Sequence, residues 1–255
     1  MRTLVIGDIH GGLKALHQVM EKAKVTTKDK MIFLGDYVDG WSESAELIQF
    51  LVELNQRQDC IFIRGNHDVW CHEWLLDKEM VNGIWEGNGG KETKESYQRN
   101  SFEEIAHLTF FHNMQNYYVD AQNRLFIHAG FSSMHGPDHE VYLTNYSWDR
   151  TLWEMAVVMD KRIEKHSVLY PKRLKLFHEI YIGHTPTPKF GSDIPMNAIN
   201  VWNIDTGAAF TGRLSILDID TKEYWQSDPL PELYPNEKGR NKMRVKKMKW
   251  DNYKK

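Results

Sequence analysis

The sequence contains few cysteines and no long apolar run. Cys60 and Cys71 are the only cysteines among 255 residues, and their surroundings predict reduced thiols rather than a disulfide framework. No apolar run reaches the roughly 18 residues that a membrane-spanning helix needs. The N-terminus also lacks the basic and apolar regions of a signal peptide. These absences favour a cytoplasmic protein with no membrane partner.

Strong net charge is missing as well. The formal net charge is −3 at pH 7, which does not by itself indicate a nucleic acid or membrane partner. The charge is unevenly distributed, because residues 238–255 hold nine Lys or Arg residues against one Asp. This basic tail is compatible with a solvated segment, with recruitment of an acidic partner or nucleic acid, and with folding back on the acidic body. We therefore expect a main domain at residues 1–237 and a separate tail at 238–255.

The chain does contain five apolar runs that each end in polar residues able to bind a metal. In the first, Asp8 and His10 follow residues 4–6, and side chains two positions apart in an extended chain point to the same side. Sites in open α/β sheets form beyond the carboxyl ends of the strands. The residues that follow the five runs are Asp8 and His10, Asp36 and Asp39, Asn66 and His67, His128, and His184.

Six of these residues are candidate metal ligands: Asp8, His10, Asp36, Asn66, His128 and His184. They offer oxygen and nitrogen without thiolate, which suits Mn²⁺, Fe or Zn²⁺ better than a sulfur-held structural site. Six ligands are too many for one ion that must also leave room for substrate. The sequence therefore predicts two divalent ions, with Mn²⁺ as the expected metal, that share a bridging carboxylate.

The spacing of apolar residues between the runs predicts the fold class. Residues 13–20 and 42–54 have helical spacing, with Ser42 as N-cap of the second helix, so the first 65 residues form a βαβαβ series. Residues 69–114 break this rhythm and predict a mostly helical insertion over the strand ends. Later segments predict two strands within 117–127, a helical region at 146–168, and strands at 180–184, 201–205 and 213–219, the last two forming an antiparallel pair. We expect a single α/β domain in which two packed sheets lie between helical layers.

Five motifs resemble one known family. GDIHG, GDYVDG, RGNHD, HAG and GHT, in this order, are similar to the phosphoprotein-phosphatase branch of the calcineurin-like metallophosphoesterases, over roughly residues 3–220. The segments 85–97 and 203–207 resemble bacterial members, including diadenosine tetraphosphatases and small Ser/Thr phosphatases. The resemblance implies a two-sheet sandwich flanked by helices, with layers in the order α-β-β-α.

The resemblance also implies a role for each matching residue. One ion would be held by Asp8, His10 and Asp36, and the other by Asp36, Asn66, His128 and His184, with Asp36 as the bridge. His67 matches the general acid that protonates the leaving alkoxide, and Asp39 matches the carboxylate that orients it. The reaction implied is attack of a metal-bound hydroxide on a phosphate ester.

The chain departs from the family pattern at one position. The second motif of the family usually continues Asp-Arg-Gly, and that arginine binds the phosphate, whereas here Gly40 and Trp41 follow Asp39. Arg64 stands where the family has a mostly structural residue. Arg150 lies in a region that supplies another phosphate-binding arginine, so we expect it to be the remaining clamp. Trp41, together with Trp70, Trp74 and Trp85, is expected in the core, although a tryptophan near the motif loops could also stack on a base.

Three functions are compatible with this pattern. The first, which the motifs favour over the other two, is a Ser/Thr protein phosphatase-like phosphomonoesterase that acts on a phosphorylated protein or a small phosphate ester. The second is hydrolysis of a dinucleoside polyphosphate such as diadenosine tetraphosphate. The third, from another class, is a non-catalytic protein that binds phosphorylated partners, and the presence of every expected ligand argues against it. The sequence carries no signal for a particular oligomeric state.

Overall fold

The computed structural model describes residues 1–241, so most of the predicted basic tail lies outside the described residues. Two five-stranded sheets form the centre, with strand orders β10-β9-β1-β2-β3 and β4-β5-β6-β8-β7. The strands are β1 (Thr3–Ile6), β2 (Lys30–Phe33), β3 (Cys60–Phe62), β4 (Tyr117–Val119), β5 (Arg124–Ile127), β6 (Glu179–Ile182), β7 (Met196–Ala198), β8 (Val201–Asn203), β9 (Ser215–Asp218) and β10 (Tyr224–Gln226).

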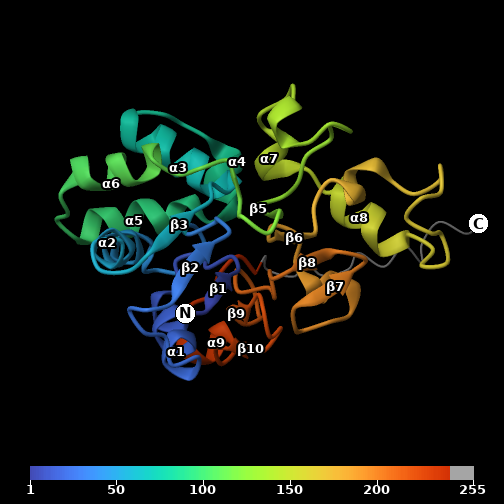
Figure 1. Cartoon of the computed structure of the whole chain (residues 1–255). Coiled ribbons are helices and arrows are strands. Elements are labelled where there is room, and N and C mark those ends of the chain that lie inside the picture. The colour runs from blue at the N-terminus through green and yellow to red at the C-terminus, as the bar shows by residue number, and fades with distance from the viewer. Residues whose placement is uncertain (242–255) are drawn as a thin grey trace, which may run out of the picture.

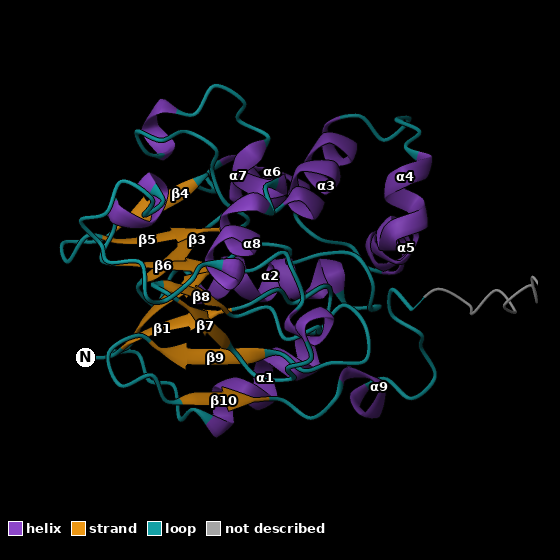
Figure 2. Ribbon diagram, turned by 90° about the vertical axis from the view of Figure 1, so that its right-hand side faces the viewer, coloured by secondary structure: helices purple, strands orange, loops and turns teal. Residues whose placement is uncertain are grey.

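Helices cover the outer faces of both sheets (Figure 1). They are α1 (Leu13–Lys22), α2 (Ser44–Leu54), α3 (Asn66–Leu76), α4 (Gly83–Trp85), α5 (Lys91–Arg99), α6 (Glu104–His112), α7 (Asn145–Trp148), α8 (Thr151–Val158) and α9 (Leu230–Leu233). Figure 1 shows the strands of the two sheets between α2, α5 and α6 on one side and α8 on the other, which confirms the predicted two-sheet α/β architecture, and Figure 2 shows the same strands from the side of α8. Helix α8 packs against the second sheet, whereas α1 and α2 pack against the first. Within residues 1–241, none of these helices is long and apolar enough to span a bilayer.

Alternation along each strand produces three layers of buried side chains. In β1, Leu4 and Ile6 pack into the cluster beneath α1 and α2, whereas Val5 points the opposite way into a cluster between the two sheets. In the second sheet, Phe126 and Tyr181 face the same inner layer and stack with ring centroids 5.0 Å apart. The strands are therefore apolar on both faces, which explains why they read as continuous apolar runs.

Parallel pairing brings the carboxyl ends of several strands to one edge. β1 pairs with β2 and β2 with β3 in parallel, and in the second sheet β5, β6 and β8 are parallel neighbours. The expected insertion at 69–114 contains most of α3 and all of α4, α5 and α6. Helix α3 begins at Asn66, so the third motif continues directly into the helical part.

Three sequence-based expectations were wrong in detail. β8 and β9 do not pair: β8 lies between β6 and β7 in the second sheet, whereas β9 pairs with β1 and β10 in the first. Both are short apolar runs, and such a run does not indicate which sheet it joins. Helix α2 begins at Ser44 with Glu43 as its N-cap, because the Ser42 hydroxyl donates a 2.6 Å hydrogen bond to Glu237 instead. The helical region expected at 146–168 ends at Val158.

Candidate metal centre

Loops that follow strands bring four of the six predicted ligands, together with His67, into two groups, and the predicted ligand Asp8 lies beside them with its Oδ2 atom 3.9 Å from His10 Nε2. Ligand atoms of His10, Asp36 and His67 lie within 4.8 Å of one another, and so do those of Asp36, His128 and His184. All of these side chains are buried. Asp36 belongs to both groups and is the residue expected to bridge two ions.

Asp36 lies between imidazoles that come from different sheets. Its Oδ2 atom is 3.6 Å from His10 Nε2 and 3.5 Å from His128 Nε2. Burial alone would raise the pKa of Asp36, but the nearby imidazoles of His128 and His67 hold that pKa well below its usual range. Asp36 is therefore an ionised carboxylate at the centre of the cluster, as a bridging ligand must be.

Backbone carbonyls fix the orientation of two imidazoles. The Nδ1 atom of His10 lies 3.1 Å from the carbonyl oxygen of Val38 and 2.9 Å from that of Asp39, and His128 Nδ1 lies 2.7 Å from the Leu34 carbonyl oxygen. A carbonyl only accepts, so each Nδ1 carries a hydrogen, and in the neutral form of each ring Nε2 is the nitrogen with a lone pair. This arrangement is typical of histidines that bind a metal through Nε2.

Three buried side-chain atoms indicate that the cluster can accommodate metal ions. Asn66 Oδ1, His128 Nε2 and His184 Nε2 are buried and have no hydrogen-bond partner among the described residues. Burying a polar atom without a partner is costly, so such atoms usually have a ligand. Together with Asp8, His10 and Asp36 they form an oxygen and nitrogen donor set that fits two divalent cations.

The backbone of the ligand loops is strained. Four residues of these loops have positive φ angles, which residues other than glycine rarely adopt. The angles are 54° at His10, 52° at Asp36, 75° at Asp39 and 65° at His184. Each such residue costs of order 1–3 kcal/mol and persists where the surrounding structure holds it in place. Four strained residues in one site indicate that the loops are shaped to aim these side chains.

His67, a member of the first group, forms a close pair with Asp39. His67 Nδ1 lies 2.6 Å from Asp39 Oδ2. Burial raises the pKa of Asp39 to about 8 and lowers the pKa of His67 to about 3, because it disfavours charge on both partners. One proton is therefore shared between them, and Nε2 carries a hydrogen wherever that proton lies. Nε2 is the ring nitrogen left to face the cavity that His67 lines.

Two residues of the helical insertion hold Asp39. The indole Nε1 of Trp85 donates to Asp39 Oδ2 at 2.7 Å, and the Thr93 hydroxyl donates to Asp39 Oδ1 at 2.6 Å. Both lie in the segment that resembles bacterial relatives, but neither was expected to have a role in the site. The insertion thus supports the second motif from behind.

Asp68 is a further residue that the sequence did not single out. Its buried carboxylate accepts hydrogen bonds from the backbone N–H groups of Asp36, Tyr37 and Gly65, at 2.8, 2.9 and 2.8 Å. A Cβ at Gly65 would collide with the Asp36 carboxylate, so only glycine allows this approach. Asp68 therefore ties the second and third motif loops together.

A cavity of about 220 Å³ is lined by residues of both candidate metal-binding groups. Three cationic side chains line it: Arg150, Lys189 and Arg240. Trp70 and Trp148 also line it, with ring centroids 5.3 Å apart, and Trp148 is 40% exposed. Arg150, the expected phosphate clamp, therefore lines the same cavity as the candidate ligands.

The other arginine and tryptophan expectations had different outcomes. Arg64 donates to the carbonyl oxygens of Phe111 and His112 at 3.0 and 3.2 Å, in keeping with a structural residue. Trp41 is fully buried, and its indole donates to the Ala208 carbonyl at 2.7 Å, so it does not offer a face to a nucleotide base. Trp70 is only partly buried and belongs to the cavity rather than to the core alone.

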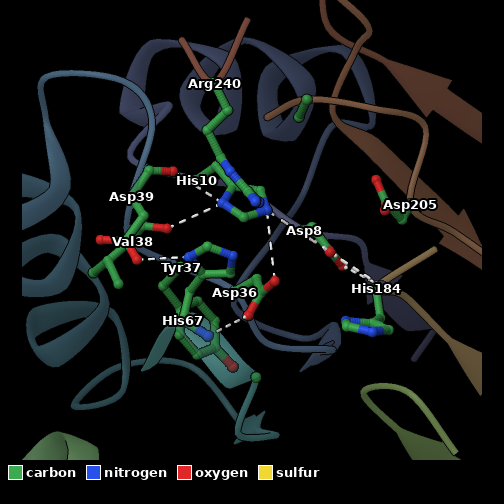
Figure 3. A network of polar contacts seen from close by, with 12 residues as sticks. Asp8, His10, Asp36, Tyr37, Val38, Asp39, His67, His184, Asp205 and Arg240 are labelled. Carbon is green, nitrogen blue, oxygen red and sulfur yellow. Dashed lines mark hydrogen bonds and ion pairs between the residues drawn. The ribbon is translucent and has the colours of Figure 1, made fainter. Parts of the chain in front are cut away.

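Two cavity residues, Asp205 and Arg240, were not predicted for the site. Asp205 belongs to the segment 203–207 that the sequence analysis noted, and burial raises its pKa to about 6. Arg240 comes from the start of the predicted basic tail. Figure 3 shows its side chain extending toward the ligand cluster. No local pattern around Arg240 could have placed it there, because the placement depends on the path of the C-terminal segment.

Comparisons with known proteins agree with this geometry. The model of the family described as calcineurin-like phosphoesterase matches residues 1–209. The Bis(5'-nucleosyl)-tetraphosphatases PrpE [asymmetrical] of Bacillus thuringiensis (strain Al Hakam) and Bacillus anthracis (strain A0248) are each 26% identical over 236 residues, which cover 85% of this chain and 90% of theirs.

Solved structures share the fold at lower identity. A putative diadenosine tetraphosphatase superposes with a TM-score of 0.58 at 16% identity, covering 88% of this chain and 92% of that one. A protein serine/threonine phosphatase from Saccharomyces cerevisiae superposes with a TM-score of 0.55 at 15% identity, covering 90% and 83% of the two chains.

Proposed function

The chain belongs to the calcineurin-like phosphoesterase family, and from this premise we propose that it is a dinuclear metal-dependent hydrolase of dinucleoside polyphosphates. The observation that carries the metal-dependent part is the pair of buried donor groups that share Asp36. Asp8, His10 and Asp36 would hold one ion, and Asp36, Asn66, His128 and His184 the other. Divalent cations bound there neutralise phosphate charge and activate a water molecule.

The residues of the chain supply the remaining chemistry. His67, held through Nδ1 by Asp39 at 2.6 Å, presents the Nε2 hydrogen to the leaving oxygen. As that hydrogen leaves, negative charge moves toward Asp39, where the Trp85 and Thr93 donors stabilise it. Burial of this pair keeps water from competing for the proton.

The lining of the cavity supports a polyphosphate substrate. Three cationic side chains, Arg150, Lys189 and Arg240, surround the metal-binding groups, and a chain of several phosphates carries enough negative charge to engage all of them. Trp148 offers an exposed aromatic face at the same cavity, and a nucleotide base can stack on such a face. The similarity to two tetraphosphatases over 85% of this chain adds to this support.

A second candidate, hydrolysis of phosphoserine or phosphothreonine in a protein, is favoured by the His67–Asp39 pair. An alkoxide is a poor leaving group and needs a positioned acid, whereas a nucleoside phosphate leaves more easily. The pair is fully formed, with Asp39 accepting hydrogen bonds from Trp85 and Thr93 and sharing a proton with His67. This second function and the first differ in substrate but use the same centre.

One assay separates these functions. Protein stripped of metal and reloaded with Mn²⁺, Fe²⁺ or Zn²⁺ is compared on diadenosine tetraphosphate, a phosphothreonine peptide and p-nitrophenyl phosphate. We expect the highest kcat/KM on diadenosine tetraphosphate. A higher kcat/KM on the peptide would favour the second candidate, and no turnover of any substrate would favour the non-catalytic alternative.

The metal requirement is tested in the same protein by elemental analysis. Asp36→Asn should lower both metal content and turnover, because it removes the shared carboxylate. Asp59→Asn is the matched control, since within residues 1–241 the side chain of this exposed acid forms an ion pair only with Lys30, at 3.6 Å, and its loss should change neither quantity. Full activity in protein without bound metal would refute the dinuclear mechanism.

A further inference from the structure

Arg240 reaches the metal-binding cavity from a segment that lies far from the motifs in sequence. Its side chain lines the same cavity as His10, His67 and Asp205. The aliphatic stem passes over Gly40, where the Cβ of any other residue would lie 3.1 Å from Arg240 Cγ and 3.5 Å from Cδ. The place that a side chain at position 40 would occupy is therefore taken by an arginine from the C-terminal segment.

The guanidinium of Arg240 is held in position, but only some of its N–H groups have a hydrogen-bond partner among the described residues. One Nη2 hydrogen bond reaches Asn88 Oδ1 at 3.2 Å, and the guanidinium carbon lies 5.4 Å from the ring centroid of Phe210. The Nε atom is buried and has no hydrogen-bond partner among the described residues. A buried, unpaired guanidinium N–H beside a cluster of metal ligands is a donor that a bound anion would satisfy.

The segment that carries Arg240 is fastened to the loop of the second motif. Tyr234 stacks on Trp41 with ring centroids 5.2 Å apart, and Glu237 accepts hydrogen bonds from the backbone N–H and the hydroxyl of Ser42, at 2.9 and 2.6 Å. The backbone N–H of Arg240 itself donates to the Ala209 carbonyl at 2.8 Å. These contacts fix the end of the described chain next to Gly40.

We propose that Arg240 is a substrate-binding residue that grips a phosphate group of the substrate from the side of the cavity opposite Arg150. The inference rests on the proposed phosphate chemistry of this cavity. Arg150 flanks the group that contains His184, and Arg240 flanks the loop that carries Asp39 and Gly40. Two guanidinium groups on different flanks suit a chain of phosphates better than a single phosphate.

The first test measures binding without turnover. Inorganic phosphate is titrated by calorimetry into metal-loaded wild-type protein, Arg240→Ala, Arg240→Lys and the control Lys238→Ala, which removes an exposed charge from the same segment. Because Arg240→Ala removes a charge-assisted hydrogen bond to the anion, we expect it to weaken phosphate binding by about 10–100-fold. The phosphate affinity of Arg240→Lys should lie between those of the wild-type protein and Arg240→Ala, because lysine keeps the positive charge but cannot form two parallel hydrogen bonds to a phosphate.

The second test uses steady-state kinetics and chemical rescue. In Arg240→Ala the KM for diadenosine tetraphosphate should rise more than kcat falls, and added guanidinium ion should recover part of the loss without affecting the wild-type protein. Lys238→Ala should leave KM unchanged. Melting temperatures of all variants establish that the fold is intact. If Arg240→Ala does not fold, the same binding and kinetic comparisons are made with Arg240→Lys.

The outcomes separate this inference from the proposed function. Weakened phosphate binding in Arg240→Ala supports the role of Arg240 even if diadenosine tetraphosphate proves a poor substrate. Unchanged phosphate affinity in Arg240→Ala overturns the role of Arg240 even if the enzyme hydrolyses that substrate well. An equal loss in Lys238→Ala also overturns it, since the effect would then be one of general charge.

Discussion

The hydrogen bond from Thr93 to Asp39 offers a sharp test of how the insertion supports catalysis. Thr93→Val keeps the shape of the side chain but removes the hydroxyl that donates to Asp39 Oδ1 at 2.6 Å and accepts from the Asp39 N–H at 3.0 Å. Hydrogen bonds to charged groups contribute about 1.5–3 kcal/mol. We expect the free energy of unfolding to fall by that amount.

Two measurements check this prediction. In a chain of this size about 1 kcal/mol corresponds to roughly 2–4 °C, so the melting temperature should fall by roughly 3–12 °C. Because Thr93 stabilises the charge that moves toward Asp39 when His67 gives up its proton, kcat should also fall. The fall should be larger for an alkyl phosphate than for p-nitrophenyl phosphate, whose leaving group needs less protonation.

Thr187→Val is the matched control for Thr93→Val. Thr187 is also fully buried, but its hydroxyl has no hydrogen-bond partner among the described residues. Removing an unpaired buried hydroxyl should leave the stability unchanged or raise it slightly. If Thr93→Val melts at the same temperature as Thr187→Val and keeps wild-type kcat, the supporting role of the insertion is wrong.

Four further predictions follow from other contacts. His67→Asn should keep its metal and slow alkyl phosphates far more than p-nitrophenyl phosphate, and loss of metal measured by elemental analysis would instead make His67 a ligand. Arg150→Ala should lower kcat/KM on the order of 10²-fold, about 2.7 kcal/mol, and wild-type kinetics would contradict the clamp. Gly40→Arg should reduce metal content and activity rather than lower KM, because Gly40 has a φ of 123° and faces Arg240; an active variant with full metal content would show that the loop tolerates a side chain. Asp29→Asn should destabilise the protein at pH 7, since hydrogen bonds from Arg2 hold the pKa of Asp29 below its usual range, and denaturation curves should show the difference from wild type shrinking as the pH falls below about 4.

The sequence was sufficient to predict which residues gather at the site where polar residues follow a strand closely in the chain. Asp8, Asp36 and His184 each follow a glycine at the end of an apolar run. Parallel pairing of β1 and β2 brings Asp8 and Asp36 to one edge, and the packing of the two sheets places His184 beside Asp8. The sequence was not sufficient where position depends on the tertiary path. The apolar runs that became β8 and β9 look alike, yet they lie in different sheets, and only the chain between them decides which.

Residues that act from a distance were missed for the same reason. Arg240 is separated from His10 by almost the whole chain, and its neighbours in sequence only indicate a basic segment. Trp85 and Thr93 belong to a helical insertion whose pattern predicts packing rather than contact with a carboxylate. Gly40 was identified as a departure, but its backbone angle, which decides whether an arginine fits there, is a property of the folded loop.

The ligand loops join two sheets that share no strand, so metal binding should affect the stability of the protein against proteolysis as well as its activity. The backbone N–H of His184 in the second sheet donates to both carboxylate oxygens of Asp8 in the first, at 3.2 and 3.0 Å, across 176 positions of the chain. With both cysteines free, the proposed ions would serve as the reversible staple between the two halves. A ligand that binds the folded protein but not the unfolded chain stabilises the fold by about 2.7 kcal/mol when its free concentration is one hundred times its dissociation constant. Metal starvation should therefore lower the abundance of this protein through proteolysis, as well as its turnover number.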